Sequence, residues 1–557
     1  MHTSSSTLYP LGIISFLVIV VPLVMHVLSS RRLDLDLLPS PPAVLLLGHI
    51  QLALHVKDMH LQFLRWHNRF GKLLRIRVLQ QDMVLIADPA LASEVLTLGP
   101  NYCARRPADY ATFNVIHGLS ARPSILTHQD EAWWKAVRRA IAPAYTPAAT
   151  RELHSLMVST MARVCERINA NLHSAANNGN STSTSSSDST GSPAGIRMDE
   201  EVLVAVLEIL LHGSLRLPPQ AMSSSDVRRT AQVAPKLVTI ANSFVSLPGK
   251  QWVYTTLPFI CKEARVMHQG RTHMTNITRQ IYNHISAKYT VNGVPSAKSD
   301  VGGSEKSDTS LASCLMRLAH PQHTPGQTFT QDDIMAEIAI NIIGQGSVPW
   351  TVSWALFQLT QRPDVESRLL SELQGLGLPC DGDLAAACDA ISHPECLRDT
   401  PYLTAVINEV MRMYPAGVSA APRLTEQPIK LGGYRIPAGV MVFPNLFTIM
   451  NYRGNWQQPD QFYPDRWLQP NSSVDPSSGA PRFIPFSIGP KICIAQHLAI
   501  MQCKIMLTLL VSCLKFQLAP TMGGIEGVMK RVEATLELRV QGGLWFTAEI
   551  RRSNNVK

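Results

Sequence analysis

The sequence predicts a mostly helical fold with a small amount of β-structure near the N-terminus. Two long segments, residues 330–362 and 496–511, are apolar on most faces, which is typical of helices that run through a core. Two short β-like runs lie at residues 73–78 and 83–87. The other segments are mainly helical in pattern, and the chain has no internal repeat.

An apolar segment at residues 11–28 predicts a membrane anchor, because a run of this length can span a bilayer. No lysine or arginine precedes it, whereas Arg31 and Arg32 follow it. The positive-inside rule then places the rest of the chain in the cytosol. We therefore expect a single-pass anchor over residues 1–30.

The chain after the anchor divides by composition. Residues 31–45 begin with two arginines and are proline-rich, which predicts a stiff, extended hinge. Residues 46–557 are expected to form one large domain. Within it, residues 177–192 and 292–310 have too few apolar side chains to bury a core, so we expect two disordered insertions there.

Charge and cysteine content narrow the classes of function. The chain has 50 lysine and arginine residues and 41 acidic residues, a net charge of +9. Because no arginine-rich block or aromatic-interleaved basic run accompanies this modest excess, nucleic-acid binding is not expected. Docking of an acidic electron donor suits the charge better. The ten cysteines form no regular disulfide framework, as expected of reduced thiols in the cytosol.

The candidate chemical centre is a loop that contains Phe486, Gly489, Lys491, Cys493 and Ala495. Cys493 lies just before an apolar helix, where backbone N–H groups and the helix dipole favour a thiolate. Gly489 can adopt backbone conformations that other residues resist. A lone cysteine before such a helix is more often a buried small hydrophobe, so the spacing of the whole loop decides the interpretation.

The loop resembles the haem-binding loop of the cytochromes P450, Phe-x-x-Gly-x-Arg-x-Cys-x-Gly. Phe486, Gly489 and Cys493 match this pattern. Lys491 replaces the usual Arg and keeps its charge, and Ala495 replaces the usual Gly and stays small. The resemblance implies the cytochrome P450 fold, mostly α with a small β-rich lobe, and haem b as cofactor with its iron held by the Cys493 thiolate.

Trp134 and Arg138, much earlier in the chain than the cysteine loop, resemble a haem-propionate site of the same family. Trp134 and Arg138 are four residues apart and share one helix face, where an indole N–H and a guanidinium can together hold a carboxylate. Without the other motifs, a surface cation beside a core tryptophan would be the simpler interpretation. The resemblance implies further propionate contacts from Arg423 and Lys491.

A third motif, Glu-x-x-Arg, consists of Glu409 and Arg412. The two residues are three positions apart on an otherwise apolar helix, which predicts a buried ion pair that needs additional partners. The resemblance gives Arg466 as the third member and implies a structural role for all three.

The function implied by the resemblance is a haem-thiolate monooxygenase that inserts one oxygen atom of O₂ into an apolar fatty acid, sterol, terpenoid or foreign compound. No glycine loop for NADPH or flavin is visible, so electrons are expected from a separate NADPH cytochrome P450 reductase, with cytochrome b5 as a second donor. The implied location is the endoplasmic reticulum membrane, with the catalytic domain on the cytosolic side. Two alternatives stay open: a haem-thiolate isomerase or dehydratase acting on a peroxide, and a non-catalytic membrane haem-binding protein.

The central helix departs from the family pattern Ala-Gly-x-Asp/Glu-Thr-Thr. Gly344 matches, but Gly346 replaces the acid and Ser347 replaces the threonine. In the family the acid and the alcohol help to deliver protons to dioxygen, so we expect Gln345, Gly346 and Ser347 at the catalytic position with a weakened relay. Restoring the acid as Gly346→Asp, with Ser347→Thr, is expected to improve coupling. Pro349 lacks an N–H and is expected to bend the helix here.

Overall fold

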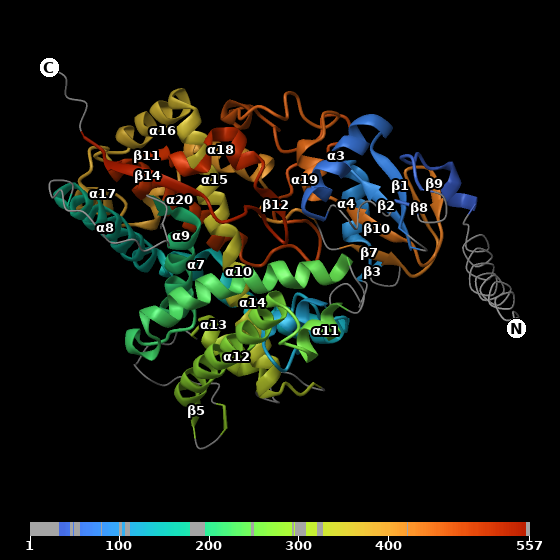
Figure 1. Cartoon of the computed structure of the whole chain (residues 1–557), viewed down its shortest axis with the longest axis horizontal. Helices are drawn as coiled ribbons and strands as arrows, with labels where there is room; N and C mark the ends of the chain where they lie inside the picture. The colour runs from blue at the N-terminus through green and yellow to red at the C-terminus, as the bar shows by residue number, and fades with distance from the viewer. Residues whose placement is uncertain are drawn as a thin grey trace, which may run out of the picture.

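The computed structural model shows a large helical body joined to a smaller β-rich lobe, with a roughly triangular outline (Figure 1). It describes residues 33–44, 48–49, 56–78, 81–99, 103–105, 112–178, 195–246, 250–291, 294–295, 308–319, 327–419 and 422–552. The predicted fold class, mostly α with a small β-rich lobe, is confirmed.

The helices, in chain order, are α3 Met59–Phe70, α4 Pro89–Thr97, α6 Glu131–Ile141, α7 Pro147–Glu152, α8 His154–Asn178, α9 Met198–Glu208, α10 Ser224–Ser246, α11 Lys250–Thr256, α12 Lys262–Tyr289, α13 Leu311–Leu318, α14 Gln331–Ile343, α15 Ser347–Gln361, α16 Pro363–Gly375, α17 Leu384–Ala390, α18 Pro401–Met413, α19 Leu446–Asn451, α20 Gln496–Cys513 and α21 Gly524–Met529. Short helical turns used below are η1 Leu33–Leu37, η8 Gly344–Gly346 and η10 Pro464–Leu468.

The strands are β1 Leu73–Val78, β2 Gln81–Ile86, β3 Cys103–Arg105, β4 Ile196–Arg197, β5 Thr290–Val291, β6 Val294–Pro295, β7 Arg423–Thr425, β8 Ile429–Leu431, β9 Tyr434–Ile436, β10 Met441–Pro444, β11 Leu514–Leu518, β12 Val532–Ala534, β13 Leu538–Val540 and β14 Trp545–Ile550. The two predicted N-terminal strands are present as the antiparallel pair β1 and β2, although the second begins and ends slightly earlier than expected.

The β-rich lobe is built from two distant parts of the chain. Its five-stranded sheet has the order β1-β2-β10-β7-β3, so C-terminal strands pair with N-terminal ones. Strand β10 runs parallel to β2 and antiparallel to β7. This pairing fixes Arg423, the first residue of β7, beside the sheet edge formed by β3.

Residues 33–44 pack on the β-rich lobe rather than extending away from it. Leu35 and Leu38 are buried in the same apolar cluster as Val84 and Val442. The backbone N–H of Arg75 donates to the carbonyl of Pro39 at 2.8 Å. Burial of a leucine side chain contributes about 1.5–3 kcal/mol, so this segment is a stable part of the lobe.

The central helix begins where the sequence predicts and is interrupted near its middle. Thr330 and Asp333 form a capping box, in which each side chain accepts a hydrogen bond from the other residue's backbone N–H. Helix α14 ends at Ile343, the turn η8 has 3₁₀ geometry, and α15 continues the chain. Because Pro349 cannot donate a backbone hydrogen bond to residue 345, the interruption lies where the proline predicts a bend.

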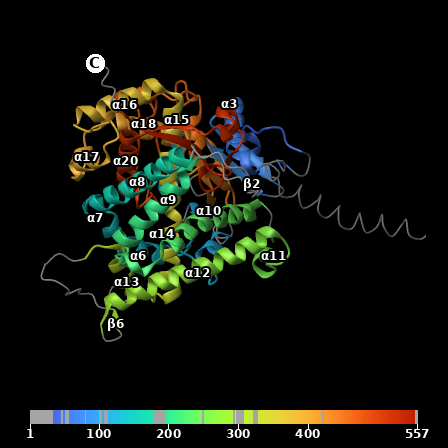
Figure 2. The same cartoon turned by 60° about the vertical axis from the view of Figure 1, so that its left-hand side comes forward.

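Figure 1 and Figure 2 both show α14 and α15 in the interior of the helical body, with α20 beside α8 and α18. Helix α20 begins at Gln496 as predicted and ends two residues later than expected. It is the one helix in the described ranges that is long and apolar enough to cross a membrane, but 67% of it is buried inside the protein. The predicted anchor at residues 1–30 lies outside the described residues.

The two predicted insertions also fall largely outside the described ranges. Helix α8 extends to Asn178, so the first two residues of the predicted insertion 177–192 are helical. In the second, Val294–Pro295 pairs with Thr290–Val291 in a short antiparallel ribbon. Residues 308–310 are described and lead into α13.

Candidate functional site

The cysteine loop is closed by its own backbone. The N–H of Cys493 donates to the carbonyl of Phe486 at 3.0 Å, and the N–H of Ile492 donates to the carbonyl of Gly489 at 3.1 Å. Gly489 has φ +79°, and a Cβ on it would lie 2.5 Å from the carbonyl oxygen of Leu96 in α4. Only glycine therefore fits this turn, because both the backbone conformation and the contact exclude a side chain.

The Cys493 thiol is exposed to solvent, yet enough of the protein surrounds it that burial raises its pKa. Two groups act in the opposite direction: the backbone N–H of Ala495, which points at the sulfur, and the positive charge of Arg138. The structure thus supplies the helix-start N–H that the sequence predicts beside Cys493. Every cysteine whose side chain is described is a free thiol.

Helix α6 brings Trp134 and Arg138 to this loop. The helix starts at Asp130, whose carboxylate accepts hydrogen bonds from the N–H groups of Ala132 and Trp133. Trp134 is buried, and Arg138 Nη1 donates to the carbonyl of Ile492 at 2.9 Å. Burial lowers the pKa of Arg138, and the nearby Cys493 opposes this effect.

Lys491 is turned toward the same helix. Its Nζ lies 3.2 Å from the centre of the Trp134 ring and 2.8 Å from the Glu131 carboxylate. An ammonium over an indole face is a favourable cation–π contact. The sequence did not predict this acidic partner, which binds a charge that was expected to serve a propionate. Arg423, by contrast, is buried in β7 of the β-rich lobe.

These residues suit a flat, anionic cofactor such as haem. The Cys493 thiol can serve as an iron ligand, and the Arg138 guanidinium and the Trp134 indole N–H can donate hydrogen bonds to a carboxylate. The bend of the central helix leaves open space at one residue. Gly344 is exposed there, although Ile343 and Gln345 on either side of it are buried, and no atom lies within 4 Å of the position of a Cβ.

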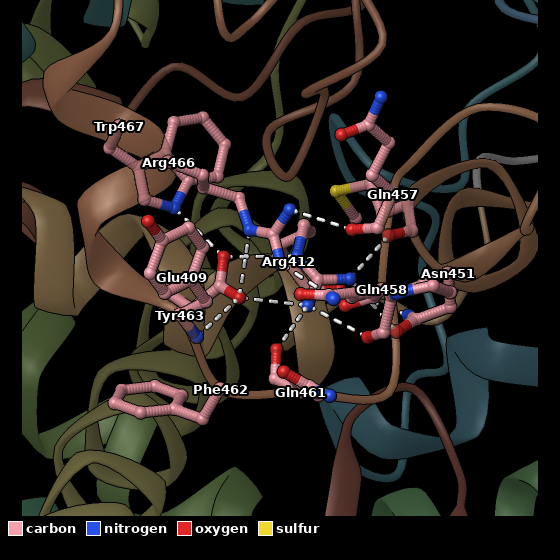
Figure 3. A network of polar contacts seen from close by, with 12 residues as sticks. Glu409, Arg412, Asn451, Gln457, Gln458, Gln461, Phe462, Tyr463, Arg466 and Trp467 are labelled. Atoms are coloured by element: carbon pink, nitrogen blue, oxygen red, sulfur yellow. Dashed lines mark hydrogen bonds and ion pairs between the residues drawn. The ribbon is translucent and has the colours of Figure 1, made fainter.

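The two residues of the Glu-x-x-Arg motif are fully buried at the centre of a polar network (Figure 3). Glu409 and Arg412 of α18 are both 0% exposed and are joined by two hydrogen bonds, Nη2 to Oε1 at 2.9 Å and Nε to Oε2 at 3.0 Å. Arg466 Nε donates to Glu409 Oε1 at 3.1 Å. The structure therefore brings the three predicted residues together.

Backbone groups and Trp467 complete this network. Arg412 donates to the carbonyls of Met450 and Pro459, at 3.0 Å and 2.8 Å. Trp467 Nε1 donates to Glu409 Oε2 at 2.9 Å, and the N–H of Tyr463 donates to Oε1 at 3.0 Å. A buried ion pair needs such partners to offset its desolvation, and here α18 is joined to the segment around η10 by them.

The bend of the central helix places the three predicted catalytic positions in different environments. Gln345 is buried and donates to the carbonyl of Asn341 at 3.1 Å. Ser347 Oγ donates to the carbonyl of Gly344 at 3.2 Å, so its hydroxyl spans the bend. At Gly346 a Cβ would lie 2.2 Å from Oε1 of Glu537. The gain in coupling expected from Gly346→Asp with Ser347→Thr stays a prediction, and the flexible end of the Glu537 side chain would have to move aside to admit the new carboxylate.

A line of polar residues runs along α14 into the turn η8, and the sequence analysis did not identify it. Asp333, Glu337, Asn341 and Gln345 are four apart and so share one face of the helix. Asn341 donates to the carbonyl of Glu337 at 2.8 Å, and the hydroxyl of Tyr145 bonds the Asn341 side chain. The spacing alone could have revealed this line, since each polar residue interrupts an otherwise apolar segment.

Glu337 is the most deeply buried acid in this line. Its Oε1 accepts the N–H of Ile125 at 2.6 Å, but its Oε2 has no hydrogen-bond partner among the described residues. Burial raises the pKa of Glu337 to about 8, and the neighbouring Asp333 adds to the effect. The side chain is therefore largely protonated at neutral pH.

Comparisons with known proteins agree with this geometry. A family model described as Cytochrome P450 matches residues 38–527. Trans-cinnamate 4-monooxygenase of Catharanthus roseus is 24% identical over 487 residues, which are 86% of each chain. The protein of the same name from Petroselinum crispum is 23% identical over 516 residues, 91% of each chain. Cytochrome P450 monooxygenase FUS8 of Gibberella fujikuroi is 33% identical over 217 residues, 38% of this chain and 40% of that one.

Proposed function

The chain belongs to the cytochrome P450 family and is a haem-thiolate monooxygenase, and we propose that it oxidises an apolar small molecule with electrons from a separate NADPH-dependent reductase. One atom of O₂ enters the substrate and the other leaves as water. The observation that carries the proposal is the self-closed cysteine loop, in which Gly489 permits the turn and the Cys493 thiol stays exposed.

We assign the haem contacts to residues near that loop. Cys493 would hold the iron, and Trp134, Arg138, Arg423 and Lys491 would hold the propionates. The bound haem supplies the oxygen-activating chemistry, to which a thiolate ligand contributes electron density. Arg138 has two roles in this assignment, because its guanidinium also fixes the loop through the carbonyl of Ile492.

Glu409, Arg412 and Arg466 act through structure rather than chemistry. Their network lies between α18 and the segment that leads to the cysteine loop. By fixing these two elements relative to each other, the network holds the loop in a shape that can bind haem. A change in one member should therefore alter haem content before it alters any single catalytic step.

The electron donor is proposed to be NADPH cytochrome P450 reductase, with cytochrome b5 as a second donor. The absence of a phosphate-binding glycine loop in the sequence supports a separate donor protein. A cavity of about 370 Å³ lies beside the thiol loop, lined by residues of α18 and α20 and by Phe486 and Ile492. A partner that binds over it would come close to the sulfur ligand. The proposed site of this encounter is the cytosolic face of the endoplasmic reticulum membrane.

The proposal is tested with membranes that contain the protein and added reductase. An apolar compound that gives a binding spectrum should be converted with consumption of NADPH, and the product should contain one oxygen atom from ¹⁸O₂. Conversion of an organic peroxide without NADPH, with no NADPH-dependent product from any compound that binds, would overturn the proposal. That result would favour the isomerase or dehydratase alternative.

A further inference from the structure

A hairpin that is distant in sequence places an acidic side chain beside Gly346, where the central helix lacks an acid of its own. Strands β12 and β13 are joined by a turn that ends at Glu537, and the Oε1 atom of Glu537 lies 2.2 Å from the position that a Cβ of residue 346 would take. Figure 1 shows β12 near the middle of the molecule, between the helical body and the β-rich lobe. The hairpin lies beyond residues 38–527, which the family model matches.

The hairpin holds this position through contacts on both sides of the turn. The N–H of Thr535 donates to the carbonyl of Glu537 at 2.9 Å, which closes the turn. Trp354 Nε1 of α15 donates to the carbonyl of Leu538 at 3.0 Å. Trp354 is itself fully buried and stacks on Tyr414, with ring centres 4.2 Å apart. The backbone of the turn is therefore held against the same helix that carries Ser347.

The Glu537 carboxyl group is half-buried and unpaired. No hydrogen bond or ion pair joins it to another side chain among the residues that the structure describes. The nearest influential charge is Arg539, whose guanidinium is bonded instead to Glu533 at 2.7 Å. Burial raises the pKa of Glu537 to about 7, and Arg539 only partly opposes this effect. Such a group exchanges a proton readily near neutral pH.

We propose that Glu537 is the proton-relay acid of this monooxygenase and that Gly346 is glycine because the Glu537 carboxyl group packs against it. This inference rests on the proposed function. In each turnover the substrate, O₂, NADPH and one proton give hydroxylated product, water and NADP⁺. NADPH supplies two electrons, the O–O bond breaks, and the departing oxygen takes up two protons. Glu537 passes a proton toward dioxygen and regains one from water, so it is unchanged at the end.

The packing claim is tested without any activity measurement. Gly346→Ala should lower the melting temperature slightly, because its Cβ would push aside the flexible end of the Glu537 side chain. Glu537→Ala should remove most of that loss when the two changes are combined. A double variant that loses as much as the sum of the single variants would show that the two residues do not touch, and would overturn the inference.

The relay claim is tested without a substrate, by the ratio of NADPH to O₂ consumed with added reductase. Release of hydrogen peroxide uses one NADPH per O₂, whereas full reduction to two waters uses two and needs more protons. We expect Glu537→Gln to move the ratio toward one and to raise peroxide release several-fold, with haem content unchanged. Glu533→Gln in the same hairpin is the control and should keep the ratio of the unchanged protein.

The position of the acid can then be exchanged. Gly346→Asp combined with Glu537→Ala should restore part of the lost ratio, since the clash is gone and a carboxylate returns. An unchanged ratio in Glu537→Gln, at normal haem content and normal NADPH consumption, would overturn the relay while leaving the monooxygenase assignment intact. A protein that binds haem but consumes no NADPH would overturn the assignment and the relay together.

Discussion

The cysteine loop and the bend of the central helix both depend on a glycine, but the two glycines have different roles. Gly489 permits a local turn that Phe486 and Cys493 close through their own backbones. Gly346 instead leaves room for a side chain from another part of the chain. The first region is complete within about ten residues of sequence, whereas the second is completed by a hairpin near the C-terminus.

The two regions therefore have different tasks, cofactor binding in the cysteine loop and proton delivery at the bend. The cysteine loop follows the family pattern closely, and its requirements are the local ones of binding a cofactor. The bend departs from the pattern, and its acid comes from elsewhere. Binding and proton delivery can therefore fail independently, which gives the variants below distinct expected signatures.

The largest expected effect comes from the buried network that supports the loop. Glu409→Ala leaves the charge of Arg412 without its carboxylate in a fully buried site, which costs roughly 3–5 kcal/mol. We expect a large fall in melting temperature and loss of haem from the purified protein. Glu395→Ala is the matched control, because Glu395 and Arg398 form an ion pair of the same spacing on the surface. That variant should lose less than about 1 kcal/mol.

A smaller but more specific effect is expected at Gly489. Gly489→Ala forces an unfavourable φ and places a Cβ against the Leu96 carbonyl, so both stability and haem content should fall. Gly479 has a similar φ of +68° but open space around it, so Gly479→Ala is a control that measures the backbone strain alone. Strain alone costs roughly 1–2 kcal/mol. Equal melting temperatures for the two variants would contradict the close contact with α4.

The buried acid Glu337, on the helix that leads to the bend, should make the stability of the protein depend on pH. The pKa of Glu337 is raised to about 8 from an ordinary value of 4.5, so the folded state holds this proton more tightly than the unfolded state. Its contribution to stability is complete below the ordinary value and is lost as the pH rises through 8. Between pH 6 and pH 9 the melting temperature should fall by a few degrees more in the unchanged protein than in Glu337→Gln. Parallel curves would show that Glu337 is not buried as a protonated acid.

The smallest effect is expected at Lys491. Lys491→Met keeps an apolar side chain over Trp134 but removes the ion pair with Glu131, a loss of about 1 kcal/mol. Because Lys491 is also assigned to a propionate, Lys491→Met should retain less haem, and Lys491→Arg should behave like the unchanged protein. Unchanged haem content in Lys491→Met would contradict the propionate contact.

The sequence predicts the loop and the buried network because their information is local. Phe486, Gly489 and Cys493 lie within one loop of eight residues, and Glu409 and Arg412 lie on one face of one helix. The sequence also predicts the bend, since Pro349 removes a hydrogen bond from the helix. It does not reveal Glu537, because no spacing rule connects a hairpin turn to a glycine in a distant helix.

The central claim, that Cys493 is the thiolate ligand of a haem, is tested most directly by the spectrum of the reduced protein with carbon monoxide. Wild-type protein and Cys396→Ser, a control on a peripheral turn, should show the red-shifted Soret band of thiolate-ligated haem. Cys493→Ser should lack that band. Retention of the band in Cys493→Ser, or purification of the wild type without haem from haem-replete cells, would contradict the account.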